Sequence, residues 1–306
     1  PTVQAANITE CEQSPIQTLT ATATAAAGAS VVWYTAATGG TVVANPILNT
    51  VGTVTYWAQA NVDNTTCASL TRTSVTLTIN PAAAAPTVQA ANITECEQSP
   101  IQTLTATATA PAGATVVWYN AATGGDVVAN PILNTVGTVT YWAQANVDNT
   151  TCSSLTRTSV TLTINPAAEA PTVQAANITE CEQSPIQTLT ATATAPAGAT
   201  VVWYNAETGG DIVANPILNT VGTVTYWAQA NVDNTTCASL TRTSVTLTIN
   251  PAAEAPTVQA ANITECEQSP IQTLTATATA PAGATVVWYN AATGGDVVAN
   301  PILNTV

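Results

Sequence analysis

The stretch QTLTATATA, residues 17–25, decides the fold class of this chain. Small apolar residues alternate strictly with threonines, so Leu19, Ala21 and Ala23 share one face and the threonines share the other. A period of two residues is that of a β-strand with one buried and one solvated face. Threonine suits the solvated face because its branched side chain favours extended backbone. The stretch therefore predicts a strand of a sheet that covers a core.

The flanking sequence predicts further short strands and no helix. Strand-like composition recurs in residues 2–8, 30–34, 41–44, 46–48, 53–62 and 69–80. In the last of these, Val75, Leu77 and Ile79 share one face, and turn residues such as ATGG, residues 37–40, separate the strands. Seven short strands at this spacing predict an all-β fold, an antiparallel β-sandwich.

The whole pattern recurs with a period of 85 residues. The sequence PTVQAANITECEQSPIQTLTATATA begins at Pro1, Pro86, Pro171 and Pro256. Such self-similarity indicates a tandem array. We expect one sandwich repeat at each of residues 1–85, 86–170 and 171–255, and a truncated fourth repeat at residues 256–306. Because the fourth copy stops before its second half, we expect the chain to be part of a longer array.

The segment between consecutive repeats is short and rich in proline. It reads NPAAAAP at residues 80–86 and NPAAEAP in later copies. Two prolines that flank alanines restrict the backbone and favour an extended connection. We therefore expect the sandwiches to be arranged end to end as a rod, which at about 40 Å per sandwich would span roughly 140 Å.

Charge excludes several function classes. Three arginines stand against 17 acidic residues, and lysine and histidine are absent, which gives a net charge of −14. A chain with so few cations is not expected to bind nucleic acid. Without histidine, lysine or a glycine-rich phosphate loop, we expect no enzyme and no cofactor. No apolar run reaches the roughly 18 residues of a membrane span.

Two cysteines per repeat point to disulfide bonds. The six in the complete repeats are Cys11, Cys67, Cys96, Cys152, Cys181 and Cys237, and Cys266 lies in the truncated copy. The chain has no histidine and no CxxC motif, so zinc binding is not favoured. Disulfides indicate an oxidising, extracellular compartment. The simplest expectation pairs Cys11 with Cys67 inside one repeat.

The aromatic residues divide between core and surface. We expect one tryptophan per repeat to fill the core: Trp33, Trp118, Trp203 and Trp288. Neighbouring side chains on a strand point to opposite faces, so one ring among Tyr34, Tyr56 and Trp57 is expected to face solvent. Such a ring could stack on a sugar.

The charged residues offer candidates for a calcium site and for a salt bridge. Glu10, Glu12 and Asp63 flank the cysteines and are calcium candidates, although no dense aspartate loop is present. Arg72 is the only base of its repeat, and we expect it to form a salt bridge with a carboxylate on the sheet face.

The motifs VVWY, residues 31–34, and LTRTSVTLTINP, residues 70–81, are similar to the Ig-like repeats of giant Bacteroidota cell-surface adhesins. These include the SprB-like gliding-motility adhesins, which are substrates of the type IX secretion system. The resemblance implies an Ig-like fold, an extracellular position on the cell surface and a role in adhesion or motility. It implies no catalytic residue.

The resemblance also opens a second disulfide pairing. Antibody domains place a tyrosine two residues before the second cysteine, whereas Thr65 stands there in this chain. In an Ig topology the first and last inter-strand loops lie at opposite ends of the sandwich. A bridge between repeats, such as Cys11 to Cys152, is therefore the alternative to Cys11–Cys67.

Two functions follow as hypotheses. The first is the structural stalk of a secreted cell-surface filament or adhesin that supports gliding motility or attachment. Its partners would be neighbouring repeats and an outer-membrane motility apparatus. The second is a multivalent module whose repeats bind surface glycans weakly and act by avidity.

Overall fold

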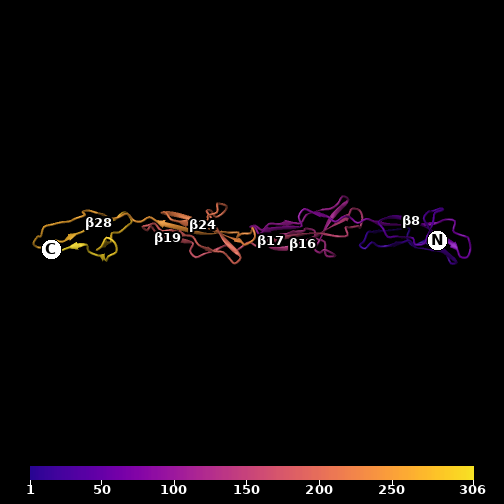
Figure 1. Cartoon of the computed structure of the whole chain (residues 1–306), viewed down its shortest axis with the longest axis horizontal. Coiled ribbons are helices and arrows are strands. Elements are labelled where there is room, and N and C mark those ends of the chain that lie inside the picture. Colours follow the sequence, from indigo (N-terminus) through magenta and orange to yellow (C-terminus); the bar gives the residue numbers. More distant parts are fainter. The chain divides into compact units, whose positions relative to one another are not determined.

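The computed structural model describes all residues from Pro1 to Val306 and contains strands but no helix. No element therefore qualifies as a membrane-spanning helix. The chain divides into two compact units, Pro1–Ala167 and Ala168–Val306, and each is described by itself. We call residues 1–85, 86–170, 171–255 and 256–306 repeats 1 to 4. The sequence colours of Figure 1 follow them from indigo to yellow.

One layer of repeat 1 is a five-stranded sheet. Its order is β2 (Asn7–Cys11), β9 (Thr73–Asn80), β8 (Gly52–Val62), β5 (Ala29–Tyr34) and β6 (Val42–Val43). All pairs are antiparallel except β2 with β9, which run parallel. The sequence predicted a wholly antiparallel sandwich, and this one pair differs. The parallel pair brings the end of β2, at Cys11, beside Asn80 and the exit from the repeat.

The second layer consists of short antiparallel pairs. β1 (Thr2–Val3) pairs with β4 (Ala23–Thr24), and β3 (Leu19–Thr20) pairs with β7 (Ile47–Leu48). The predicted strand at residues 17–25 is thus two short pieces that keep the predicted alternation of buried and exposed residues. The first predicted strand, residues 2–8, is also divided, because β1 and β2 belong to different layers.

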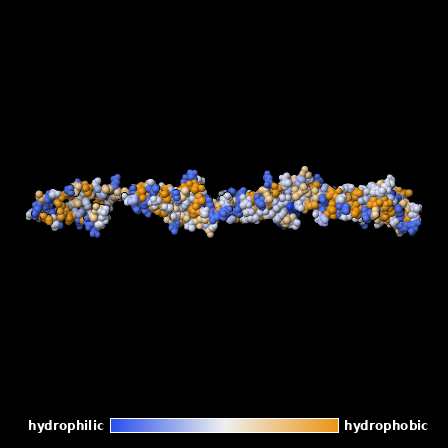
Figure 2. Space-filling model, in the orientation of Figure 1, coloured by the Kyte–Doolittle hydropathy of each residue, from blue (hydrophilic) through white to orange (hydrophobic).

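The core of repeat 1 lies between these layers. Leu19 and Leu48 from one layer meet Trp33 and Leu77 from the other. Leu77 is 0% exposed, and every second residue of β9 is buried in this core, as the alternation of the strand predicts. Because each sandwich is thin, some apolar side chains stay outside, and Figure 2 shows hydrophobic residues interspersed with hydrophilic ones on the surface.

Repeats 2 and 3 have the same topology and their own cores. The strands of repeat 2 are β10 (Thr87–Val88), β11 (Asn92–Cys96), β12 (Leu104–Thr105), β13 (Ala108–Thr109), β14 (Ala114–Tyr119), β15 (Ile132–Leu133), β16 (Gly137–Val147) and β17 (Thr158–Asn165). Those of repeat 3 are β18 (Thr172–Val173), β19 (Asn177–Cys181), β20 (Leu189–Thr190), β21 (Ala193–Thr194), β22 (Ala199–Tyr204), β23 (Ile217–Leu218), β24 (Gly222–Val232) and β25 (Thr243–Asn250). The counterpart of β6 is reduced to a single bridge in each.

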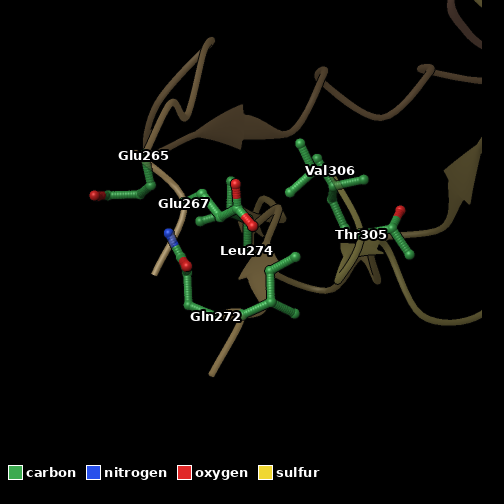
Figure 3. Close-up of a pocket in the computed structure, with 8 residues that line it drawn as sticks. Glu265, Glu267, Gln272, Leu274, Thr305 and Val306 are labelled. Atoms are coloured by element: carbon green, nitrogen blue, oxygen red, sulfur yellow. The ribbon is translucent and has the colours of Figure 1, made fainter. Parts of the chain in front are cut away.

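Repeat 4 leaves its core open. Its strands are β26 (Thr257–Val258), β27 (Leu274–Thr275), β28 (Ala278–Thr279), β29 (Trp288–Tyr289), β30 (Val297–Val298) and β31 (Ile302–Leu303). Leu303 is 56% exposed, whereas its counterpart Leu48 is 9% exposed, because nothing replaces β8 and β9. A pocket of about 420 Å³ results, with Glu267, Leu274 and Val306 in its lining (Figure 3). It is uncovered core and not a preformed ligand site.

Candidate functional site: the junction of repeats 1 and 2

A disulfide bond joins repeat 1 to repeat 2. It connects Cys11 to Cys152, 141 residues later, with the two Cα atoms 5.2 Å apart. This separation lies in the usual range for disulfides. Repeats 1 and 2 are therefore connected twice, once by the peptide linker and once by this bond.

The first cysteine is held by the end of the sheet. Cys11 is the last residue of β2, and the next amide, Glu12 N, donates to Asn80 O at 2.8 Å. Gln17 Nε2 donates to Cys11 O at 2.6 Å, which fixes the backbone on the other side. The Glu12 carboxylate also accepts from Ala82 N at 3.0 Å. One glutamate thus ties the exit of β2 to the linker that leads to repeat 2.

The second cysteine is held by a tight loop after β16. Val147 N donates to Cys152 O at 2.8 Å, and Cys152 N donates to Thr150 Oγ1 at 3.0 Å. Asn149 closes the loop with a φ of 58°, a left-handed conformation that asparagine tolerates better than most residues. Cys152 is 2% exposed. Hydrogen bonds to their backbone atoms thus hold both cysteines in place.

The expected bond between Cys11 and Cys67 is wrong, and the alternative Cys11–Cys152 is the one present. The parallel pairing of β2 places Cys11 beside Asn80, at the end of β9. Cys67 precedes Thr73, where β9 begins. The seven steps of β9 span about 23 Å, whereas a disulfide needs Cα atoms within about 7 Å. The two cysteines of one repeat therefore lie at opposite ends of the sandwich.

The other cysteines differ from the expectation as well. Cys96 and Cys237 are disulfide-bonded, as predicted. Cys67 and Cys181 were predicted in disulfides but are free and exposed, and so is Cys266.

A count of free thiols tests this pattern. We expect three alkylated cysteines per native, unreduced chain, at Cys67, Cys181 and Cys266. Pairing within each repeat would leave only Cys266 free. Cleavage after glutamate then releases Cys11 with Glu12 as a dipeptide. We expect residues 98–169, which contain Cys152, to carry such a dipeptide, and residues 13–95 to carry none. A dipeptide on residues 13–95 would contradict the structure.

A clamp on the outer face of the large sheet uses the only base of each repeat. The guanidinium of Arg72 lies 3.4 Å from the centroid of the Tyr34 ring. Arg72 Nη1 donates to Ala36 O and Gly39 O, both at 2.6 Å, and Nε donates to Gln59 Oε1 at 3.3 Å. We call this set of contacts the arginine clamp. The expected salt bridge with a carboxylate is wrong, because the partners are carbonyl oxygens, an amide and a ring.

The arginine clamp fixes the turn between β5 and β6. Gly39 and Gly40 have φ values of 63° and 77°, which point the Gly39 carbonyl toward the arginine. A Cβ atom on Gly40 would lie 2.9 Å from Ala36 N, so the turn requires glycine there. Repeats 2 and 3 build the same clamp on Arg157 with Tyr119 and on Arg242 with Tyr204. The clamp was not predicted from the sequence, although alternation along β5 places Tyr34 on the face opposite Trp33.

Three stretches of the chain match one domain family. Residues 1–81, 84–166 and 169–251 each match the family described as "Ig-like domain CHU_C associated". The chain belongs to this Ig-like family. No curated protein sequence matches the chain. The truncated repeat 4 lies outside the matched residues.

Several solved structures are similar to the chain. The I-band fragment I67–I69 from titin is 12% identical, with a TM-score of 0.36, and the match covers 81% of this chain and 96% of the fragment. The four N-terminal Ig domains of Dscam1 isoform 6.44 are 14% identical, with a TM-score of 0.23 and coverages of 81% and 73%. Sidekick-1 immunoglobulin domains 1–5 are 15% identical, with a TM-score of 0.22 and coverages of 90% and 63%.

The tryptophans of the Ig-like repeats lie on both faces of the large sheet. Trp33 is 9% exposed in the core of repeat 1. Trp118 and Trp203 pack against the cores of repeats 2 and 3, and Trp288 of repeat 4 is half-buried. Trp57 lies beside Tyr34 on the outer face, because the two residues are paired across β5 and β8.

Of the rings of Tyr34, Tyr56 and Trp57, only one is free to stack on a sugar. Tyr56 points to the core, and its hydroxyl donates to Ile47 O at 2.8 Å. Tyr34 is covered by the arginine clamp. Trp57 is half-buried and carries no such cover. Next to it, Thr55 and Thr76 hydrogen-bond to each other at 3.0 Å across the strands.

The calcium candidates do not form a site within one Ig-like repeat. Glu10 and Glu12 lie at the end of β2, beside the C-terminal end of β9. Asp63 follows β8, at the opposite end of the sandwich. No group of three or more acidic or cysteine side chains is arranged to hold a metal ion. The structure therefore does not bring these three candidates together in one repeat.

Proposed function

We propose that the chain is a segment of the stalk of a secreted filament or adhesin on the cell surface. The observation that carries this proposal is the disulfide between Cys11 and Cys152. A binding domain needs no covalent bond to its neighbour, whereas a stalk under tension gains from one. Disulfides persist in oxidising compartments outside the cytosol, which supports the extracellular position.

The stalk would hold an adhesive or motile tip away from the cell. The resemblance to SprB-like adhesins favours gliding motility or surface attachment as the process, with an outer-membrane motility apparatus as the partner. The arginine clamp supports the stalk as well, because it uses the only cation of each repeat inside the domain. The acidic surface would keep neighbouring stalks apart by repulsion.

Small-angle scattering tests the extension that a stalk requires. Repeats placed end to end predict a maximum dimension of about 140 Å and a radius of gyration of about 40 Å. A compact arrangement of 306 residues would give a radius of gyration near 19 Å. The smaller value would contradict the proposal. Replacing both Cys11 and Cys152 by serine should broaden the distribution of distances, because only the linker then connects repeats 1 and 2.

Glycan binding is the second candidate, and the outward ring of Trp57 favours it. The same ring recurs at Trp142 and Trp227, so weak contacts would multiply along the array. We expect the stalk to be the correct function, so replacing these three tryptophans by alanine should leave adhesion of cells that display the chain unchanged. Leu70, which is exposed, provides the matched control when it is changed to alanine in the same cells. Loss of adhesion in the tryptophan variant alone would favour glycan binding.

A further inference from the structure

A pocket of about 290 Å³ lies beside the arginine clamp of repeat 3. It is formed by the turn after β22, by β24 and by the loop between β24 and β25. Its lining includes Glu207, Thr208, Gln229, Leu240, Thr241 and Arg242. Repeat 3 has further repeats before and after it, and the truncated repeat 4 follows the opposite end of β25. The pocket therefore belongs to a complete repeat and does not result from the ends of the chain.

The arginine clamp fixes the turn that carries Glu207. Arg242 Nη1 donates to Ala206 O and Gly209 O, both at 2.7 Å, and Glu207 lies between these two residues in the chain. Gly209 has a φ of 61°, a left-handed conformation that glycine adopts without strain. The backbone of the turn is thus held before any ligand binds, so little conformational entropy is lost on binding.

Several polar groups of the pocket have no partner within the protein. The Glu207 carboxylate forms no hydrogen bond or ion pair, and the hydroxyls of Thr208 and Thr241 form no hydrogen bond. Arg242 Nη2 carries two hydrogen atoms and donates only to Gln229 Oε1, at 3.3 Å. One carboxylate, two hydroxyls and one N–H therefore remain for a ligand.

The free carboxylate requires a cation that the repeat does not supply. The chain has no lysine, and the guanidinium of Arg242 donates to carbonyl and amide oxygens. The two hydroxyls and the free N–H suit the hydroxyl groups of a sugar. Leu240, which is 47% exposed, offers an apolar wall to the C–H groups of a sugar ring. The volume is near the lower end for ligand pockets, which suits a single ring.

We propose that this pocket binds an amino sugar. The protonated amine contacts the Glu207 carboxylate, and the hydroxyl groups contact Arg242 and the two threonines. The charge-assisted hydrogen bond between ammonium and carboxylate is the strongest of these contacts. A single sugar ring held in this way binds with a dissociation constant on the order of 1 mM. Binding at this pocket is compatible with a stalk and does not require one.

Glu207 distinguishes repeat 3 from the other repeats. The residues at this place are Ala37, Ala122 and Ala292 in repeats 1, 2 and 4. Repeat 2 otherwise has the same turn sequence and the same leucine, threonine and arginine in its loop. We therefore expect one amino-sugar site per chain. The glycan binding considered above for the outward tryptophans would instead give an equal site in each complete repeat.

Nuclear magnetic resonance of the isotope-labelled full chain tests the proposal. Glucosamine is added in mildly acidic buffer, which keeps its amine protonated, up to about 10 mM, tenfold above the expected dissociation constant. The amide signals of Thr208 and Gly209 should move, whereas those of the same turns in repeats 1 and 2 should not. Glucose and N-acetylglucosamine, which have no charged amine, should bind more weakly by roughly tenfold or more.

Two substitutions exchange the turns of repeats 2 and 3. Glu207→Ala gives repeat 3 a residue with which the turns of repeats 1 and 2 already fold, and should weaken glucosamine binding by roughly tenfold or more. Ala122→Glu should create a second site, seen as movement of the amide signals of Thr123 and Gly124 with glucosamine.

Four results would overturn the proposal. They are the absence of any movement with glucosamine, equal binding of glucose, unchanged affinity of the Glu207→Ala variant, and no response of repeat 2 after Ala122→Glu. Equal movement in all three complete repeats of the unchanged chain would also overturn it, in favour of the tryptophan surface.

Discussion

Reduction of the Cys11–Cys152 bond is expected to lengthen the fully unfolded chain by about 490 Å when it is pulled from its two ends, at roughly 3.5 Å per residue. The bond closes a loop of 141 residues, and its ends are held 5.2 Å apart at their Cα atoms. While the bond is intact, force passes from Cys11 to Cys152 directly and cannot extend the residues between them. Single-molecule force spectroscopy measures the difference as a change in contour length.

The measurement needs a chain with one disulfide only. Replacing the remaining cysteines by serine leaves Cys11 and Cys152 as the single pair, and the same molecules are then compared with and without reductant. A third sample that also carries Cys152→Ser should have the long contour under both conditions. Equal contour lengths for the single-pair chain in both conditions would show that the bond does not form.

The protected loop contains most of two domains. It begins after β2 and ends beyond β16, so it includes nearly all of the core of repeat 1 and three of the six buried core residues of repeat 2. Even if both sandwiches unfolded under load, the residues between Cys11 and Cys152 could not extend. A bond inside one repeat would protect fewer residues and would leave the connection to the next repeat to the linker alone.

The alternation of residues in the sequence predicted the fold well. The pattern of residues 17–25 placed Leu19 and Ala21 in the core, and β9 buries Val75, Leu77 and Ile79 as expected. These predictions succeed because burial on a strand depends on a period of two, which a single segment displays.

The cysteine pairing could not be predicted in the same way. It depends on β2 running parallel to β9, and nothing within either strand indicates its partner or its direction. Spacing along the chain favoured Cys11 with Cys67, whereas the ends of the sandwich, where the bond forms, are defined only after the sheet order is known. The arginine clamp was missed for a related reason. Arg72 and Tyr34 are 38 positions apart, and only the sheet order brings them together.

Replacing the clamp arginine by alanine in all three complete repeats, at Arg72, Arg157 and Arg242, is expected to lower the free energy of unfolding of each repeat by about 3 kcal/mol. A hydrogen bond from a charged donor contributes about 1.5–3 kcal/mol, and stacking on a ring adds roughly 0.5–2 kcal/mol. Partial exposure to water reduces their sum. For domains of this size the melting temperature should fall by roughly 12–24 °C, followed by circular dichroism.

The substitution also removes three positive charges, which takes the net charge from −14 to −17. Changing the exposed residues Gln4, Gln89 and Gln174 to glutamate makes the same change in net charge without touching the clamp, and should shift the melting temperature by less than a quarter as much. Arginine to lysine keeps the charge, but an ammonium cannot stack flat on the tyrosine while it donates to two carbonyls. We therefore expect lysine to recover less than half of the loss. Full recovery by lysine would mean that charge, and not the planar fork of the guanidinium, holds the turn.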